Sequence, residues 1–230
     1  MSELSSEYGS RKSVREIMDI TEINSENIGE LYDVENYKGI TDALNYLYRY
    51  NTGAGGKSFV VKYFELLSLI DDLIMRAVQE NSSEFLYELL ADEGNPYFWK
   101  CHKINILSEI IVNGSLDLTE TLFRVLEGIN FTMKNLDEAL QYIAESMVFS
   151  EISGDVEVDA KLLMMIESLE YKGLIDPEGE ESQMVLLYAF SERFENSARQ
   201  LNRLGIWLSP VKCNYIRGVY PGIEKYFEDN

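Results

Sequence analysis

The residues with the clearest chemical spacing are 51–58, which read NTGAGGKS. A phosphate-binding P-loop has one glycine, four further residues and then Gly-Lys-Ser or Gly-Lys-Thr, so that backbone amides surround the phosphate and the lysine neutralises it. Gly56-Lys57-Ser58 fits the end of that pattern, but Asn51 stands where the first glycine belongs. The preceding LNYLYRY also lacks the buried apolar strand from which a P-loop begins. The segment indicates a loop between helices, with a nucleotide-binding enzyme as the less favoured alternative.

The other reactive residue types do not assemble into a site. Cys101 and His102 are sequence neighbours, and adjacent side chains diverge on a helix or strand, so they do not form a nucleophile–base pair. Cys213 is the other thiol and there is one histidine, too few ligands for a structural zinc site. Carboxylate pairs such as Asp71-Asp72 arise by chance in a chain with 40 acidic residues. The sequence therefore predicts no catalytic residue, no cofactor and no metal.

The charge balance is strongly acidic, with 40 Asp and Glu against 20 Lys and Arg and a net charge of -20. Such a field repels nucleic acid and anionic membranes and attracts basic partners, although it also serves solubility alone. Two cysteines do not form a disulfide framework, and the first residues, MSELSSEYGSRK, lack the apolar core of a signal peptide. We expect a soluble cytoplasmic protein that binds neither nucleic acid nor membrane.

Apolar residues recur at helical spacing along most of the chain, most clearly at 103–133. Two helices are predicted there, separated by Asn113-Gly114. Capping boxes are expected at Asp117 with Glu120, and for the next helix at Asn135 with Glu138. No segment shows the sustained apolar–polar alternation of a strand, so the predicted fold class is all-α.

Four details of this helical prediction can be compared directly with a structure. Residues 58–80 form either one long helix or two with a corner near Ser68, and both remain open. Residues 97–99 (Tyr-Phe-Trp) are expected outside a helix, and residues 149–156 in a loop. Pro210 and Pro221 predict two short C-terminal helices, because proline is tolerated in a first helical turn.

Glycines that end predicted helices recur at a regular interval. Gly94 to Gly128 is 34 residues, Gly128 to Gly173 is 45, and Gly173 to Gly205 is 32. Each interval holds two helical patterns, and the second pattern ends at the glycine. The longest interval is explained by an insertion at 148–157, where a longer loop has a small entropic cost.

A period near 33 residues, with two helices and a glycine after the second, resembles the ankyrin repeat. The best copy is NILSEIIVNGSLDLTETLFRVLEGIN, residues 105–130, although no copy carries the T-P-L-H-x-A signature. The resemblance implies stacked helix pairs over residues 40–208, as a short ankyrin-like or related α-solenoid. Residues 1–39 would be a polar segment with a capping helix, and residues 209–230 would hold capping helices. Another helix-pair stack or a non-repeating helical domain gives similar spacing.

In an ankyrin-like stack the turns between repeats project towards partners. These turns are expected at 97–100, 129–134, 176–181 and 206–209. The predicted partner-binding residues are Tyr97, Trp99, Met133, Lys134, Glu178, Glu180 and Trp207, with inter-repeat packing as the alternative role of the aromatic residues. The predicted function is a non-enzymatic interaction module for a basic protein. The alternative is an acidic nucleic-acid mimic, of the viral or phage type, that inhibits a DNA- or RNA-binding protein.

Overall fold

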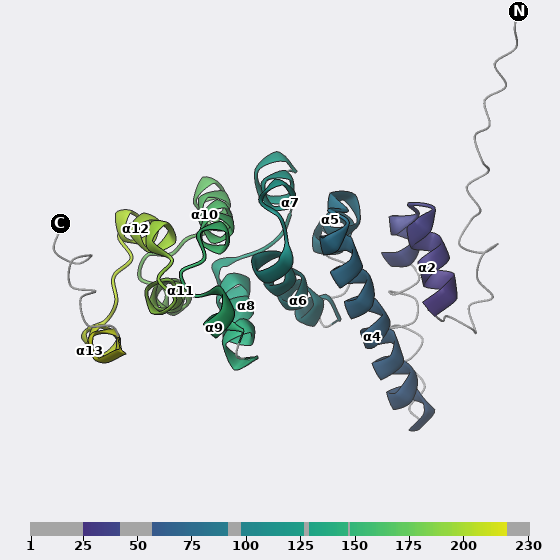
Figure 1. The fold of residues 1–230 in the computed structure, drawn as a ribbon, viewed down its shortest axis with the longest axis horizontal. Coiled ribbons are helices and arrows are strands. Elements are labelled where there is room, and N and C mark those ends of the chain that lie inside the picture. The colour runs from purple at the N-terminus through teal and green to yellow at the C-terminus, as the bar shows by residue number, and fades with distance from the viewer. Residues whose placement is uncertain (1–24, 42–56, 92–97, 127–128, 147, 220–230) are drawn as a thin grey trace, which may run out of the picture. The chain divides into compact units, whose positions relative to one another are not determined.

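The computed structural model describes residues 25–41, 57–91, 98–126, 129–146 and 148–219 (Figure 1). Within these ranges the side chains of 25–27, 57–67, 98–102 and 219 are not described. Every regular element in the described residues is a helix and none of them is in a strand, which confirms the all-α class. The chain forms two compact units, Met1–Leu69 and Ile70–Asn230. The domain boundaries expected at 39/40 and 208/209 stay predictions.

The first unit contains α2 (Ser25–Asp33), a helical turn at 37–41 and the first part of α4. Ile28, Leu31 and Ile40 are buried there. Thr41 lies inside the helical turn, and its hydroxyl donates to the Lys38 carbonyl. The predictions for residues 1–24 and 42–56, which include most of the glycine-rich loop, lie outside the described residues.

Helix α4 (Lys57–Gln79) is continuous, so the segment through Ser68 is one helix and not two. It passes from the first unit into the second at Ile70. Its second half buries Ile70, Ile74 and Ala77, while Asp71 is exposed. The long apolar periodicity without Gly or Pro accounts for its length.

The second unit continues with short helices joined by short loops. They are α5 (Ser83–Ala91), α6 (Phe98–Asn113), α7 (Leu116–Glu120), the π-helix η1 (Thr121–Val125), α8 (Met133–Glu145), α9 (Phe149–Ile152), α10 (Val156–Tyr171), α11 (Glu180–Ser191), α12 (Glu195–Arg203) and α13 (Pro210–Val219). None of the described helices is long and apolar enough to cross a membrane.

The packing of the second unit places these helices in two rows (Figure 1). In the first row α6 packs on α8, α8 on α11, and α11 on α13. In the second row η1 packs on α5, both α7 and η1 pack on α10, and α10 packs on α12. The rows contact each other through pairs such as α11 and α12. Along the chain α6 and α11 are each followed directly by a second-row helix, and α8 is followed by the short α9 and then by α10 of the second row.

Several hydrogen bonds between segments distant in the sequence share the same separation. Asn105 bonds Asp71 and Ser115 bonds Asn81, both across 34 residues. Arg124 bonds Glu167 and Lys172 bonds the Ile129 carbonyl, both across 43 residues. Asp159 accepts from the Ser197 hydroxyl across 38 residues. The separations of 34 and 43 residues therefore each occur at two different points of the second unit.

Two predicted capping boxes are wrong because the helices begin earlier. Ser115, not Asp117, caps α7, and its hydroxyl accepts from the Leu118 amide at 3.1 Å. Thr132 caps α8 and forms a reciprocal capping box with Asn135. In both cases a residue with a hydroxyl group lies before the predicted N-cap. Its oxygen accepts a hydrogen bond from an amide of the first turn that would otherwise have no partner.

Two further local predictions need correction. Helix α6 begins at Phe98, so Phe98 and Trp99 lie in a helix and not before it. The expected loop at 149–156 contains the short helix α9, whose Phe149 and Ile152 are buried. Burial of two apolar side chains stabilises this single turn although its sequence has weak helical periodicity.

The predicted helix ends are confirmed at the two later glycines. Gly173 and Gly205 follow α10 and α12 with φ angles of +65° and +83°, a conformation that glycine adopts without strain. Pro210 begins α13 as expected, whereas Pro221 lies outside the described residues.

Candidate partner-binding surface

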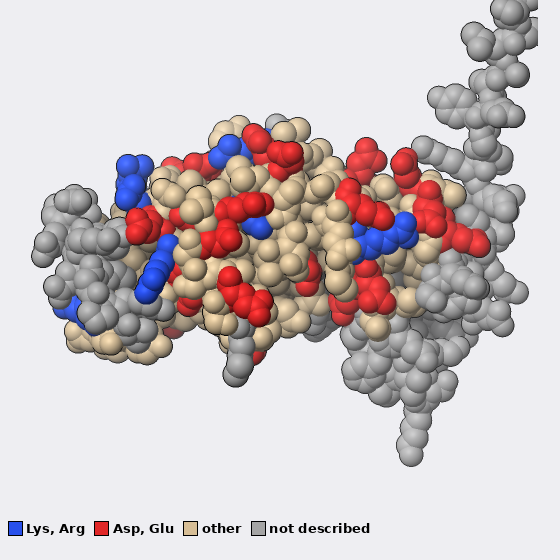
Figure 2. Space-filling model, in the orientation of Figure 1, with Lys and Arg blue, Asp and Glu red and all other residues tan. Residues whose placement is uncertain are grey.

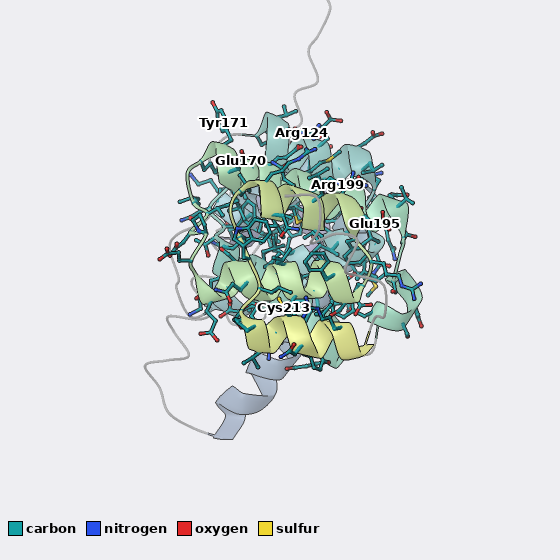
Figure 3. The ribbon with its side chains drawn as sticks, turned by 90° about the vertical axis from the view of Figure 1, so that its left-hand side faces the viewer. Arg124, Glu170, Tyr171, Glu195, Arg199 and Cys213 are labelled. Atoms are coloured by element: carbon teal, nitrogen blue, oxygen red, sulfur yellow. The ribbon has the colours of Figure 1, made fainter. Side chains whose placement is uncertain are left out.

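The loops that lead into the first-row helices share one side of the second unit. Helices α8, α11 and α13 pack side by side, and each begins after a loop that leaves a second-row helix. These loops therefore lie along one edge, which we call the loop edge and define as residues 129–134, 170–181 and 206–209. Figure 3 shows Glu170 and Tyr171 on one side of the second-row helices and Glu195 on the opposite side.

Two of these loops repeat the same local pattern of burial. Residues 129–132 read Ile-Asn-Phe-Thr, and residues 206–209 read Ile-Trp-Leu-Ser. In each, the first and third side chains are buried and the second is exposed. The fourth residue is a hydroxyl that accepts from a first-turn amide, that of Asn135 at 3.4 Å or that of Lys212 at 3.5 Å. Trp207 therefore projects from the same place in its loop as Asn130.

Two lysine side chains, one from α6 and one from the residue that follows α10, anchor the loop at 129–132. Lys103 donates to the Asn130 carbonyl at 3.1 Å, and Lys172 donates to the Ile129 carbonyl at 2.9 Å. The Lys172 ammonium also lies 5.5 Å from the centre of the Phe131 ring, and burial lowers the pKa of this lysine. A loop held from both sides loses little conformational freedom when a partner binds, which favours affinity.

The loop edge exposes large apolar side chains. Tyr171 is 91% exposed, Trp207 is 45% exposed and Leu174 is 44% exposed. Exposed carboxylates lie among them, at Glu170, Asp176, Glu178 and Glu180. Aromatic side chains beside charged groups are a common composition of protein–protein interfaces.

Carboxylates also gather where α8 and α11 pack together. We call Asp137 and Glu138 of α8, with Glu180 and Glu181 of α11, the carboxylate cluster. Burial, followed by the charges of the other three carboxylates, raises the pKa of Asp137 to about 6, while Lys212 of α13 acts in the opposite direction. Burial, followed by the charge of Asp137, also raises the pKa of the Tyr188 phenol. This surface therefore holds negative charge at close spacing in a partly buried place.

The predicted partner-binding residues fall into three groups. Lys134, Glu178, Glu180 and Trp207 are exposed on the loop edge. Met133 is only 5% exposed, because the first residue of α8 turns into the core, so its side chain contributes to packing. Tyr97 lies outside the described residues, as does the side chain of Trp99 in the first turn of α6.

The sequence interpretation missed Tyr171 and Leu174, two of the most exposed apolar side chains on the loop edge. They flank the helix-ending Gly173 on its two sides. A search for apolar residues next to helix-ending glycines would have found both of them, together with Trp207.

Two buried ionisable residues, Asp159 and Lys161, have structural roles because each forms hydrogen bonds inside the protein. Asp159 accepts hydrogen bonds at the beginning of α12, and Lys161 donates to the Gly114 carbonyl at 2.7 Å. Burial lowers the pKa of Lys161, while Glu157 and Asp155 act against that shift. No group of three or more His, Cys, Asp or Glu residues in the described ranges could hold a metal ion.

Comparison with known proteins returned nothing: no protein-family model, curated protein or solved structure matches this chain.

Proposed function

We propose that this chain is a non-enzymatic protein-interaction module that binds a basic partner protein through the loop edge. Its scaffold would be a short ankyrin-like or related α-solenoid with capping helices at both ends. In such a scaffold each helix pair contacts mainly its neighbours. The hydrogen bonds at separations of 34 and 43 residues, each of which occurs at two points of the second unit, support this architecture.

The observation that carries the functional proposal is the exposure of Tyr171, Leu174 and Trp207 on the loop edge. Large apolar side chains lose favourable burial when they remain in water, at about 25 cal/mol per Å² of apolar surface. Their placement on one edge, with one loop anchored by Lys103 and Lys172, is the arrangement expected of a partner contact.

The charge of the chain supports a basic partner. Complementary charge raises association rates, and it makes binding weaker as salt concentration increases. The carboxylate cluster lies beside the loop edge, and it shares Glu180 with that edge. An Arg or Lys of a partner would relieve the repulsion that helps to raise the pKa of Asp137.

Affinity capture with a matched pair of variants tests the proposal. The tagged full chain is incubated with lysate of the source cells, and captured proteins are identified by mass spectrometry. The Tyr171→Ser/Leu174→Ser/Trp207→Ser variant removes the apolar contacts of the loop edge. The Val156→Ser variant is the control, because Val156 is 78% exposed at the start of α10, on the opposite edge.

We expect one or more basic proteins to be captured by the wild-type chain and by Val156→Ser, with strong loss in the triple variant. Equal capture by the triple variant and the control would exclude the loop edge as the binding surface. Far-UV circular dichroism of each variant checks that the helices are retained.

The carboxylate cluster favours a second candidate, inhibition by mimicry of nucleic-acid phosphates. A mimic needs negative charges in a continuous stripe that a basic groove can accept. On the face shown in Figure 2 the carboxylates form separate groups, which supports the first candidate more than this one. Competition between the chain and DNA or RNA for a captured basic protein distinguishes them, because only a mimic displaces the nucleic acid.

A further inference from the structure

Helix α13 has one covered side and one open side. It packs on α11, with Ile216 fully buried and Lys212 and Cys213 half-buried. Val211 is 78% exposed and Tyr215 is 60% exposed. These two residues are four positions apart, so they lie next to each other on the helix. We call Val211 and Tyr215 the outer stripe of α13.

The charge of α13 differs from that of the other described helices. Among those longer than five residues, α13 alone contains no Asp or Glu, and it carries the exposed Arg217. The chain has a net charge of -20, and α13 is therefore a local region without negative charge of its own. A negatively charged segment that packs along α13 meets no carboxylate of this helix. An occupant that combines apolar and acidic residues would fit this side.

Residues 220–230, which directly follow α13, have this composition. They read YPGIEKYFEDN, with apolar residues at Tyr220, Ile223, Tyr226 and Phe227 and carboxylates at Glu224, Glu228 and Asp229. We propose that residues 220–230 fold back along α13 and cover its outer stripe. The proposal does not depend on the loop edge or on the identity of a partner.

The reach of the segment is sufficient. The eight steps from Val211 to Val219 span about 12 Å along the helix, at 1.5 Å per residue. Eight residues after Val219 span up to about 26 Å when extended, so Phe227 can reach Val211. A second copy of the chain is a poorer occupant, because it would bring another net charge of -20 to the contact.

Thiol labelling at two matched positions tests this proposal. Val211 and Val156 are both 78% exposed, and each lies in the first turn of a helix. The full-length Val211→Cys and Val156→Cys variants are treated with a maleimide, and labelling is followed by mass spectrometry of tryptic peptides. Position 211 falls on the peptide 204–212, which contains no native cysteine.

If residues 220–230 cover the outer stripe, the thiol in Val211→Cys labels more slowly than that in Val156→Cys, by about fivefold or more, because labelling requires local opening. Adding Tyr226→Ser/Phe227→Ser to Val211→Cys should restore the faster rate. Adding Lys225→Ser, which removes no apolar side chain, should leave the rate slow.

Three results would overturn the proposal. The first is equal labelling of Val211→Cys and Val156→Cys in the presence of the intact segment. The second is protection at position 211 that persists in Tyr226→Ser/Phe227→Ser, because another group would then cover the stripe. The third is protection that falls on tenfold dilution, because the occupant would then be a second copy. Unchanged far-UV circular dichroism in every variant excludes unfolding as the cause of faster labelling.

Discussion

The Asp159 carboxylate on α10 lies 2.6 Å from the hydroxyl of Ser197 in α12. The same carboxylate accepts hydrogen bonds from the Ser197 amide at 2.9 Å and from the Asn196 amide at 2.9 Å. Asp159 therefore caps a helix of the next pair instead of its own. Both Asp159 and Ser197 are buried, so these bonds form with little competition from water.

Replacing Asp159 should destabilise the second unit strongly. Asp159→Ala leaves the buried amide and hydroxyl donors of α12 without their acceptor, and we expect the free energy of unfolding to fall by about 3 kcal/mol. Asp155→Ala is the control, since Asp155 caps its own helix α10 at an exposed position. This substitution should lower the free energy of unfolding by about 1 kcal/mol. Urea unfolding measures both. Equal losses would show that the link between helix pairs adds nothing beyond ordinary capping.

Gly114 should not tolerate a side chain. A Cβ atom at this position would lie 2.7 Å from the Ile110 carbonyl oxygen, which is backbone and cannot move freely. We expect Gly114→Ala to lower the free energy of unfolding by about 2 kcal/mol. Gly218→Ala in α13 meets nothing within 4 Å and should raise it by about 0.5 kcal/mol, because alanine favours the helix. In thermal unfolding we expect a lower unfolding temperature for Gly114→Ala and a higher one for Gly218→Ala. Unchanged stability of Gly114→Ala would show that the turn has room for a Cβ atom.

Asp137 should make the chain less stable as pH rises from about 4 to 6. The folded chain holds the Asp137 proton up to a pKa of about 6, whereas the unfolded chain releases it near the ordinary value of 3.8. The stabilising contribution is therefore full below that ordinary value and is lost as pH passes the folded-state pKa.

Asp137→Asn should thus raise the free energy of unfolding at pH 7.5 by about 1 kcal/mol, after allowance for solvent screening, and change it little at pH 4. Asp72→Asn, at an exposed site on α4, is the control for the removal of one carboxylate from the surface. Urea unfolding at the two pH values measures the difference. A gain of the same size at both pH values would exclude the titration of Asp137 as its cause.

Trp207 should matter for partner binding much more than for folding. We expect Trp207→Ala to change the free energy of unfolding by less than about 1 kcal/mol, because this side chain is 45% exposed. Phe131→Ala, in the corresponding loop before α8, removes a fully buried ring and should lower it by about 4 kcal/mol. Thermal unfolding of the two variants checks this contrast, and a large loss for Trp207→Ala would make Trp207 part of the core.

The sequence predicted the helices well because apolar spacing is a local signal. The buried residues Ile110, Leu118 and Leu122 all belong to the predicted periodic pattern. The helix ends at Gly173 and Gly205 were also predictable, because a positive φ angle favours glycine at a helix end. All-α structure thus followed from periodicity and terminators alone.

The misplaced features depend on tertiary contacts or on competition between neighbouring residues. Ser115 and Asp117 both favour an N-cap, and sequence alone does not show which one the backbone selects. Met133 was predicted to bind a partner because it belongs to a loop segment, but the orientation of α8 buries it. The exposure of Tyr171 likewise depends on which face of α10 its neighbours leave open.

The most direct test of the loop edge as a binding surface is amide hydrogen exchange of the full chain, alone and bound to its captured partner. We expect slower exchange on binding at 129–134, 170–181 and 206–209. We expect no change at the turns of the opposite edge, 153–157 and 192–196. Protection confined to those opposite turns, with none in the three loops, would show that the partner does not bind the loop edge.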